Sequence, residues 1–208
     1  MGTTTFIIEM NREPVVNFIR STLLLSNVSI SKQLLEDVVE NFEPASFARH
    51  DYFVAAGKVN THHFFMTEGF MRAFTHNPEG EEVTTDFFNC NRPVFEPDSF
   101  ITQTKSLENI QAIANCQGFL VSFEKSNELF HAVPEFREFG RLMLLNEFAA
   151  HKKRALSLIT QTAEERYAEL VGTNREIFQY AQLKHIASYL GITDSSLSRI
   201  RKEFSRRH

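Results

Sequence analysis

The chain has 208 residues, of which 42% are hydrophobic and 23% are charged. This composition is ordinary for a globular protein in water, and the length suits one large domain or two smaller ones. No apolar run approaches the ~18 residues that a membrane-spanning helix needs, and the N-terminus lacks a basic flank followed by an apolar core. The sequence therefore predicts a cytoplasmic protein with no membrane segment.

Charge is uneven along the chain, whose formal net charge is −4 at pH 7. Residues 184–208 contain six Lys or Arg and two acidic residues, so this segment carries +4 and the other 183 residues carry −8. A basic end on an acidic body indicates an anionic partner for that end alone.

The first elements in chain order are two short helices within residues 11–42. Apolar residues recur three and four apart in "EPVVNFIR" and "SKQLLEDVVENF", and Ser31 is the predicted N-cap of the second helix.

From about residue 44 to 124 the pattern changes to short strands. Turn residues separate Phe-rich and β-branched segments, which favours a small antiparallel barrel or sandwich. "NPEG" at 77–80 has Pro and Gly where a type I turn prefers them, so it should join two antiparallel strands. The predicted strand segments are "YFVAA", "HHFFMTEG", "FMRAFTH", "EEVTTDFF", "NIQAIANC" and "GFLVSF".

A long helix is predicted from Pro134 to about residue 160. Its apolar residues cover more than one face around 136–150, and a helix that is apolar on several sides must be buried on several sides. We therefore expect one face to pack on the barrel and another on a second copy of the chain; burial within one subunit is the alternative. One row at three-four spacing, interrupted by Lys152, contains Leu142, Leu145, Ala149, Leu156 and Ile159.

Residues 182–208 predict two short helices joined at Gly191. Gly191 supplies the backbone freedom of a tight helix exit, and the Thr193 hydroxyl can cap the next helix. The buried stripes are Leu183, Ile186, Ala187 and Leu190 in the first helix, and Leu197, Ile200 and Phe204 in the second.

The opposite side of the second helix has small hydroxyls near its start and long cations one and two turns later. This arrangement is typical of a recognition helix in the DNA major groove, although a plain αα-corner with a solvated basic face would give a similar pattern. We expect Arg199 to read a base and Lys202 to contact phosphate. The predicted DNA-binding residues are Thr193, Ser195, Ser196, Ser198, Arg199, Lys202 and Arg206.

"AEERYAEL" at 163–170 and "HIASYLGITDSSLSRIRKEF" at 185–204 resemble the C-terminal half of Crp/Fnr-type transcription regulators. "FFMTEGFMRAF" around Gly69 and the long helix fit the same family. The resemblance implies an α+β fold: an N-terminal antiparallel, jelly-roll-like β-roll of the cyclic-nucleotide-binding type with flanking helices (1–125), a long connecting dimerisation helix (126–160) and a C-terminal helix-turn-helix domain (161–208).

The resemblance also implies a homodimer that binds a palindromic operator in double-stranded DNA. Members of the family usually follow the recognition helix with a two-stranded wing, but this chain stops at His208. Phosphate contacts are therefore expected from the basic tail or from helix ends.

The effector site of the family is not matched. Members that bind cyclic nucleotides carry a Gly-Glu pair and then an Arg in a cassette that corresponds to residues 94–113 here, where both features are missing. Lys105 is the only cation from 93 to 124, and Glu108 falls near the expected phosphate position. Cyclic AMP and cyclic GMP should therefore bind poorly, and a different, less charged effector or no effector is expected. The iron–sulfur sensor of the family needs four cysteines, whereas the chain has only Cys90 and Cys116.

No catalytic motif stands out, since nucleophile-elbow, Walker, His-Glu-x-x-His and dinucleotide-binding patterns are all missing from the sequence. We therefore predict no enzymatic activity, no cofactor and no metal. The alternative function is a β-roll that binds a small molecule or a protein partner and no longer binds DNA. Asp51, Asp86, Glu96 and Asp98 could form a carboxylate pair, but no spacing singles them out. His62, His63 and His76 are conceivable haem ligands, but the adjacent His62 and His63 point to opposite faces of a strand, so structural or surface roles are expected for the histidines.

Overall fold

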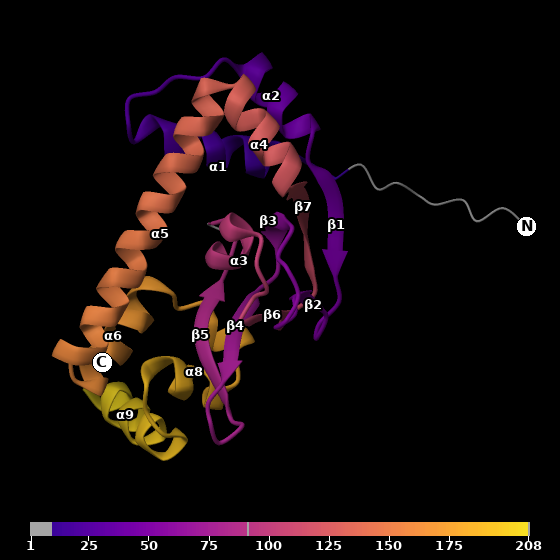
Figure 1. Cartoon of the computed structure of the whole chain (residues 1–208). Helices are drawn as coiled ribbons and strands as arrows, with labels where there is room; N and C mark the ends of the chain where they lie inside the picture. Colours follow the sequence, from indigo (N-terminus) through magenta and orange to yellow (C-terminus); the bar gives the residue numbers. More distant parts are fainter. Residues whose placement is uncertain (1–9, 91, 208) are drawn as a thin grey trace, which may run out of the picture.

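The computed structural model describes residues 10–90 and 92–207. Figure 1 shows a helical cap at one end, an antiparallel roll in the middle, and a second group of helices at the other end. The long helix α5 (Pro134–Thr160) runs along one side and joins the two helical groups. Within the described ranges, no helix is long and apolar enough to cross a membrane.

The helical cap consists of α1 (Glu13–Leu24), α2 (Lys32–Glu40), α4 (Phe123–Ala132) and the first turns of α5. α2 begins at the predicted cap, where the Leu34 amide donates to Ser31 Oγ at 3.1 Å. Ile19, Leu35 and Phe136 are buried in the cluster that joins these helices to β3 and β7. The cap thus covers the outer face of one sheet of the roll.

Seven strands in the described residues form two antiparallel sheets. One sheet has the order β1-β7-β3, with β1 at Glu43–Phe47, β7 at Cys116–Ser122 and β3 at His62–Glu68. The other has the order β2-β6-β4-β5, with β2 at Tyr52–Val54, β6 at Asn109–Ala112, β4 at Met71–His76 and β5 at Glu82–Phe88. The space between the sheets is filled by buried side chains that include Phe64, Met66, Met71 and Ile110.

The six predicted strand segments are all strands, and the turn at 77–80 joins β4 to β5, with the Gly80 amide 2.9 Å from the Asn77 carbonyl. Two elements of the roll were not predicted: β1 and the short helix α3 (Pro97–Thr102). The β1 segment "EPASF" contains Pro44 and no β-branched residue, so its local propensity is poor. Pairing with β7, from Glu43 opposite Leu120 to Phe47 opposite Cys116, makes it a strand.

α5 begins at Pro134, as the sequence predicted. Residues that precede a proline avoid the helical region, and Val133 is extended, with φ −123° and ψ 99°. This break ends α4 at Ala132, so the segment 126–160 contains the end of α4 followed by α5.

The C-terminal group contains α6 (Ala163–Thr173), α7 (Ile177–Tyr180), α8 (Leu183–Leu190) and α9 (Asp194–Arg207). α6 opens with a capping box, in which the Glu165 amide donates to Thr162 Oγ1 and the Thr162 amide donates to Glu165 Oε2. The core of this group also contains Phe70 and Phe87 of the roll. The helical group is therefore seated on the outer face of β4 and β5, as Figure 1 shows for α8.

Candidate DNA-reading helix and effector pocket

The turn between α8 and α9 is built on Gly191. Gly191 has φ 67° and ψ 36°, in the left-handed region that favours glycine. The Ile192 amide donates to the Ala187 carbonyl at 3.0 Å, and the Gly191 amide donates to the Ser188 carbonyl at 3.0 Å. These bonds satisfy the last carbonyls of α8 and fix the direction in which the chain leaves it.

Thr193 begins α9 as predicted: the Ser196 amide donates to Thr193 Oγ1 at 3.3 Å. Leu197 and Ile200 are buried, and they belong to the same cluster as Ala187 of α8. The small Ala187 side chain lets the two helices pack closely. Because these residues fix one face of α9 inward, its opposite face is turned to solvent.

The structure places the predicted DNA-binding residues on that outer face of α9 and at its start. All are exposed except Ser196, which is partly buried and hydrogen-bonded to Thr193 Oγ1 at 3.0 Å. Among the described residues, Arg199, Lys202 and Arg206 have no ion-pair or hydrogen-bond partner. Three cations on one helix face are therefore free to meet an anionic partner.

Two arginines from outside the helix-turn-helix hold the end of α8, and sequence reasoning missed both. Arg154 of α5 donates from Nη2 to the Tyr189 carbonyl at 2.8 Å, and its guanidinium lies 3.7 Å from the centroid of the Tyr189 ring. Arg166 of α6 donates from Nε and Nη2 to the Leu190 carbonyl at 3.1 and 2.9 Å. The long helix α5 is thus tied directly to the helix-turn-helix.

A polar contact between α8 and the roll was also not predicted. Arg72 of β4 is 1% exposed, forms an ion pair with Glu82 and lies over the Phe74 ring at 4.2 Å. His185 Nε2 lies 3.8 Å from a Glu82 carboxylate oxygen. Burial, then the charges of Arg72 and Lys184, lower the pKa of His185 to about 4, so the imidazole is neutral near pH 7.

The roll itself contains a cavity of about 120 Å³ that opens between β5, β6 and α5. Three carboxylates, Asp86, Glu108 and Glu147, line it together with His151. Burial raises the pKa of Glu108, and the charges of Glu96 and Asp86 act in the same direction. This lining is a poor environment for an anion.

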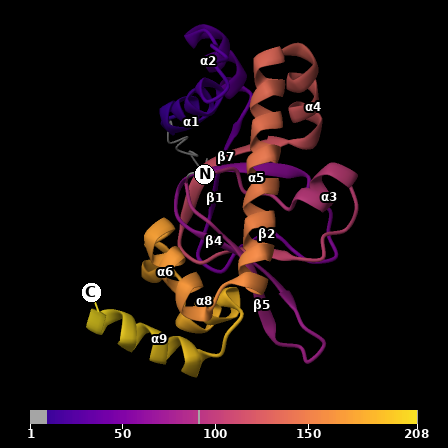
Figure 2. The same cartoon turned by 90° about the vertical axis from the view of Figure 1, so that its left-hand side faces the viewer.

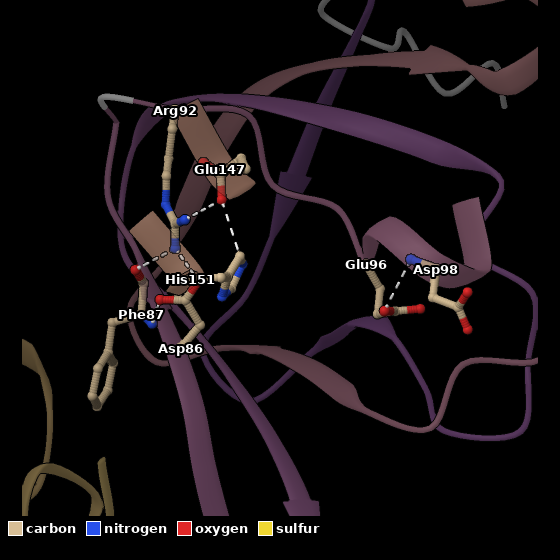
Figure 3. Close-up of polar contacts among 7 residues, drawn as sticks. All are labelled: Asp86, Phe87, Arg92, Glu96, Asp98, Glu147 and His151. Carbon is tan, nitrogen blue, oxygen red and sulfur yellow. Dashed lines mark hydrogen bonds and ion pairs between the residues drawn. The ribbon is translucent and has the colours of Figure 1, made fainter. Parts of the chain in front are cut away.

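Arg92 ties two of these carboxylates together (Figure 3). Its guanidinium pairs with Asp86 and donates from Nη1 to Glu147 Oε2 at 2.7 Å, which connects β5 to α5. Ligand atoms of Asp86, Glu147 and His151 lie within 4.8 Å of one another, but both carboxylates are already engaged in ion pairs with Arg92. The network therefore serves to hold α5 on the roll.

The other acidic residues that the sequence singled out do not join this network. Glu96 accepts hydrogen bonds from the Asp98 and Ser99 amides and so caps α3, away from Asp86 (Figure 3). Asp51 accepts from the Ala48 amide at 2.8 Å. Glu96 therefore has a capping role and Asp51 a role in the turn that precedes β2.

Comparison of the sequence with known proteins gives no match, whereas comparison of the structure gives clear matches. No family model and no curated protein matches the chain. The regulator CLP of Xanthomonas campestris, described as responsive to c-di-GMP, aligns with a TM-score of 0.67 at 13% identity over 85% of this chain and 93% of its own. FixK2 of Bradyrhizobium japonicum aligns with a TM-score of 0.67 at 16% identity over 80% and 85%. A Crp/Fnr-family transcriptional regulator of Thermus thermophilus aligns with a TM-score of 0.62 at 17% identity over 79% and 87%.

The chain therefore has the fold of Crp/Fnr-type transcription regulators, with an antiparallel roll, a long helix and a C-terminal helix-turn-helix. The sequence predicted a resemblance to this family, most specifically in residues 163–204, and the fold class that the resemblance implied. Both are confirmed at the level of the fold. CLP and the Thermus thermophilus protein are described as regulators.

Proposed function

We propose that the protein is a sequence-specific DNA-binding transcription regulator that acts in the cytoplasm and binds a palindromic operator as a homodimer. In this proposal residues 1–125 are the sensor, 126–160 connect and dimerise, and 161–208 read DNA. The observation that carries the proposal is the exposed face of α9, where Arg199, Lys202 and Arg206 have no partner among the described residues. Cations beside small hydroxyls suit simultaneous contact with base edges and phosphates.

A surface of α5 supports the dimer. Phe136 and Phe139 are buried against the cap, while the opposite side of the helix is uncovered in Figure 2. Side chains separated by three, four or seven to eight positions share one side of a helix, so the exposed apolar residues form a stripe along it. A two-fold operator requires two reading heads, which pairing of this stripe would supply. The exposed stripe consists of Leu145 (50%), Phe148 (67%), Leu156 (51%) and Ile159 (82%).

The test is selection of binding sites from a random pool of double-stranded DNA, followed by gel shifts with the enriched site and a scrambled site. We expect a palindromic consensus and tighter binding to it than to the scrambled duplex. The variant with both Arg199→Ala and Lys202→Ala is the control and should enrich nothing. If the wild-type chain enriches no sequence, the proposal fails and the alternative of a roll that no longer serves DNA binding takes its place.

A further inference from the structure

A second cavity, of about 70 Å³, lies outside the roll between β3, the segment 93–101 and the helices α4 and α5. It is distinct from the roll cavity, because Phe64 and Met66 point into the roll whereas their neighbours His63 and Phe65 face this second space. Ile101 (55% exposed) and Leu144 (45%) stand at its opening. Most of its wall is formed by Phe95, Phe100, Phe130, Phe136, Phe139 and Met143.

His63 is the single polar side chain among the described residues that line this cavity. Its ring stacks on Phe100 with centroids 3.9 Å apart and meets Phe95 edge-on at 4.4 Å. Burial, and then the neighbouring His62, lower the pKa of His63 to about 3, so it is neutral at any physiological pH. No hydrogen bond to either ring nitrogen is found in the described part of the chain, and because His63 is only partly buried, neither nitrogen is fully enclosed.

A neutral imidazole has one N–H donor and one nitrogen acceptor, and a polar partner in this largely apolar cavity would stabilise it. Ordered water is a poor solution here. The cavity has room for about two waters, but a buried water needs roughly two to four polar partners and the lining side chains offer only His63. An apolar cavity with one convergent polar group is instead typical of a small-molecule site.

We propose that this cavity binds a small, uncharged, largely apolar molecule of about one ring, with one hydrogen-bonding group directed at His63. A charged ligand would lose its hydration without finding an opposite charge. The cavity is smaller than the ~150 Å³ that holds benzene in an engineered protein core, so the ligand must displace the flexible Met143 side chain or extend between Ile101 and Leu144. This inference goes beyond the proposed regulator function and does not depend on DNA binding.

Met143 provides a direct probe, because its side chain lines the cavity. The full chain, labelled with ¹³C in its methionine methyl groups, is titrated with phenol, with benzene and with benzoate. We expect phenol to shift the Met143 methyl signal and to bind about tenfold more tightly than benzene, a difference of about 1.4 kcal/mol from the hydrogen bond to His63. Benzoate should give no shift.

Two variants make the test specific. His63→Phe keeps a ring between Phe95 and Phe100 but removes the polar atoms, so phenol should lose its advantage over benzene; His62→Phe, on the other side of β3, should retain it. Ile101→Trp at the exposed rim should weaken both ligands. The proposal is overturned if phenol leaves the Met143 signal unchanged at millimolar concentration, or if His63→Phe binds phenol as wild type does. It is also overturned if Ile101→Trp changes the dimer dissociation constant but leaves the affinities for phenol and benzene unchanged. In that case a second copy of the chain would fill the opening.

Discussion

Arg199 and Lys202 lie one turn apart on the exposed side of α9. In the proposed complex the two side chains contact different parts of the DNA. Arg199 has the planar fork that matches a guanine edge, whereas Lys202 is a compact charge suited to phosphate. Both are free of intramolecular partners among the described residues, so truncating either one should leave the fold intact. Their separate contributions can therefore be measured on DNA alone.

We predict that Arg199→Ala costs about 1–3 kcal/mol on the selected operator and relaxes its sequence preference, because a base contact is lost. Lys202→Ala should weaken binding to all sequences alike. It should also reduce the salt dependence of binding, because one phosphate contact fewer means that fewer counterions are released. Fluorescence anisotropy on operator and scrambled duplexes at several salt concentrations measures both effects. Unchanged specificity in Arg199→Ala would mean that another face of α9 meets the groove.

Gly191 fixes the geometry of the turn between α8 and α9. Gly191 has φ 67°, and a Cβ placed there would lie 3.3 Å from Leu158 Cδ2. We predict that Gly191→Ala destabilises the fold by about 1–2 kcal/mol, from the left-handed backbone alone. Gly172→Ala is the matched control, since no atom lies within 4 Å of its added Cβ and the residue is helical. It should be neutral or stabilise by up to about 1 kcal/mol in urea unfolding.

At the scale of elements, α5 contacts three separate parts of the molecule. Phe136 and Phe139 anchor it in the cap, Glu147 binds it to the roll through Arg92, and Arg154 connects it to the end of α8. These contacts occupy one side of the helix along its whole length. The other side is uncovered and has the exposed apolar stripe of Leu145, Phe148, Leu156 and Ile159, which is the physical reason to expect a second copy there.

We predict that Phe148→Glu raises the dimer dissociation constant at least about 100-fold, because each copy loses a buried aromatic side chain worth roughly 1.5–3 kcal/mol. Asn146→Glu is the control: it is exposed two residues earlier, about 200° around the helix, and should leave the dimer unchanged. Light scattering over a concentration series measures both. A wild-type chain that stays monomeric at micromolar concentration would contradict the dimer.

At the scale of the whole molecule, apolar and ionisable groups together hold the C-terminal helices on the roll. Phe70 stacks on Tyr180 with centroids 5.2 Å apart, while Arg72, Glu82 and His185 meet at the same interface. Among the described residues, Arg72 Nε and Nη1 and His185 Nδ1 have no partner there. Buried groups left without partners make this interface sensitive to any added charge.

Acid should weaken this docking through His185. Its pKa is about 4 in the folded chain against 6.5 for the free side chain, so unfolding takes up a proton between these values. The stability due to neutral His185 is complete above pH 6.5 and is lost as the pH falls toward 4. Urea unfolding of wild type and His185→Gln from pH 7 to pH 4 should show wild type losing more free energy of unfolding on acidification. His131→Gln, at an exposed position on α4, is the control variant.

The charge of the roll cavity gives a prediction about ligands. Asp86, Glu108 and Glu147 line it, and its one nearby guanidinium, Arg92, is already paired with two of them. A cyclic phosphate placed there would lose its water without gaining a free cation. Calorimetric titration with cyclic AMP and cyclic GMP should therefore give no dissociation constant below ~10 μM, about −7 kcal/mol. Tighter binding by either nucleotide would mean that these carboxylates do not face the ligand.

The sequence by itself determined the elements whose signals are local. Apolar periodicity, Gly191 and the Ser31 and Thr193 caps predicted α2, α8 and α9, because helices depend on neighbours three and four positions away. Tertiary structure alone decided β1, since its strand conformation comes from pairing with β7, which lies some seventy residues further along the chain. It also brought Arg92 to Glu147, Arg154 to Tyr189 and His63 to the α5 cavity, because such contacts depend on how distant elements pack and leave no periodic pattern in the chain.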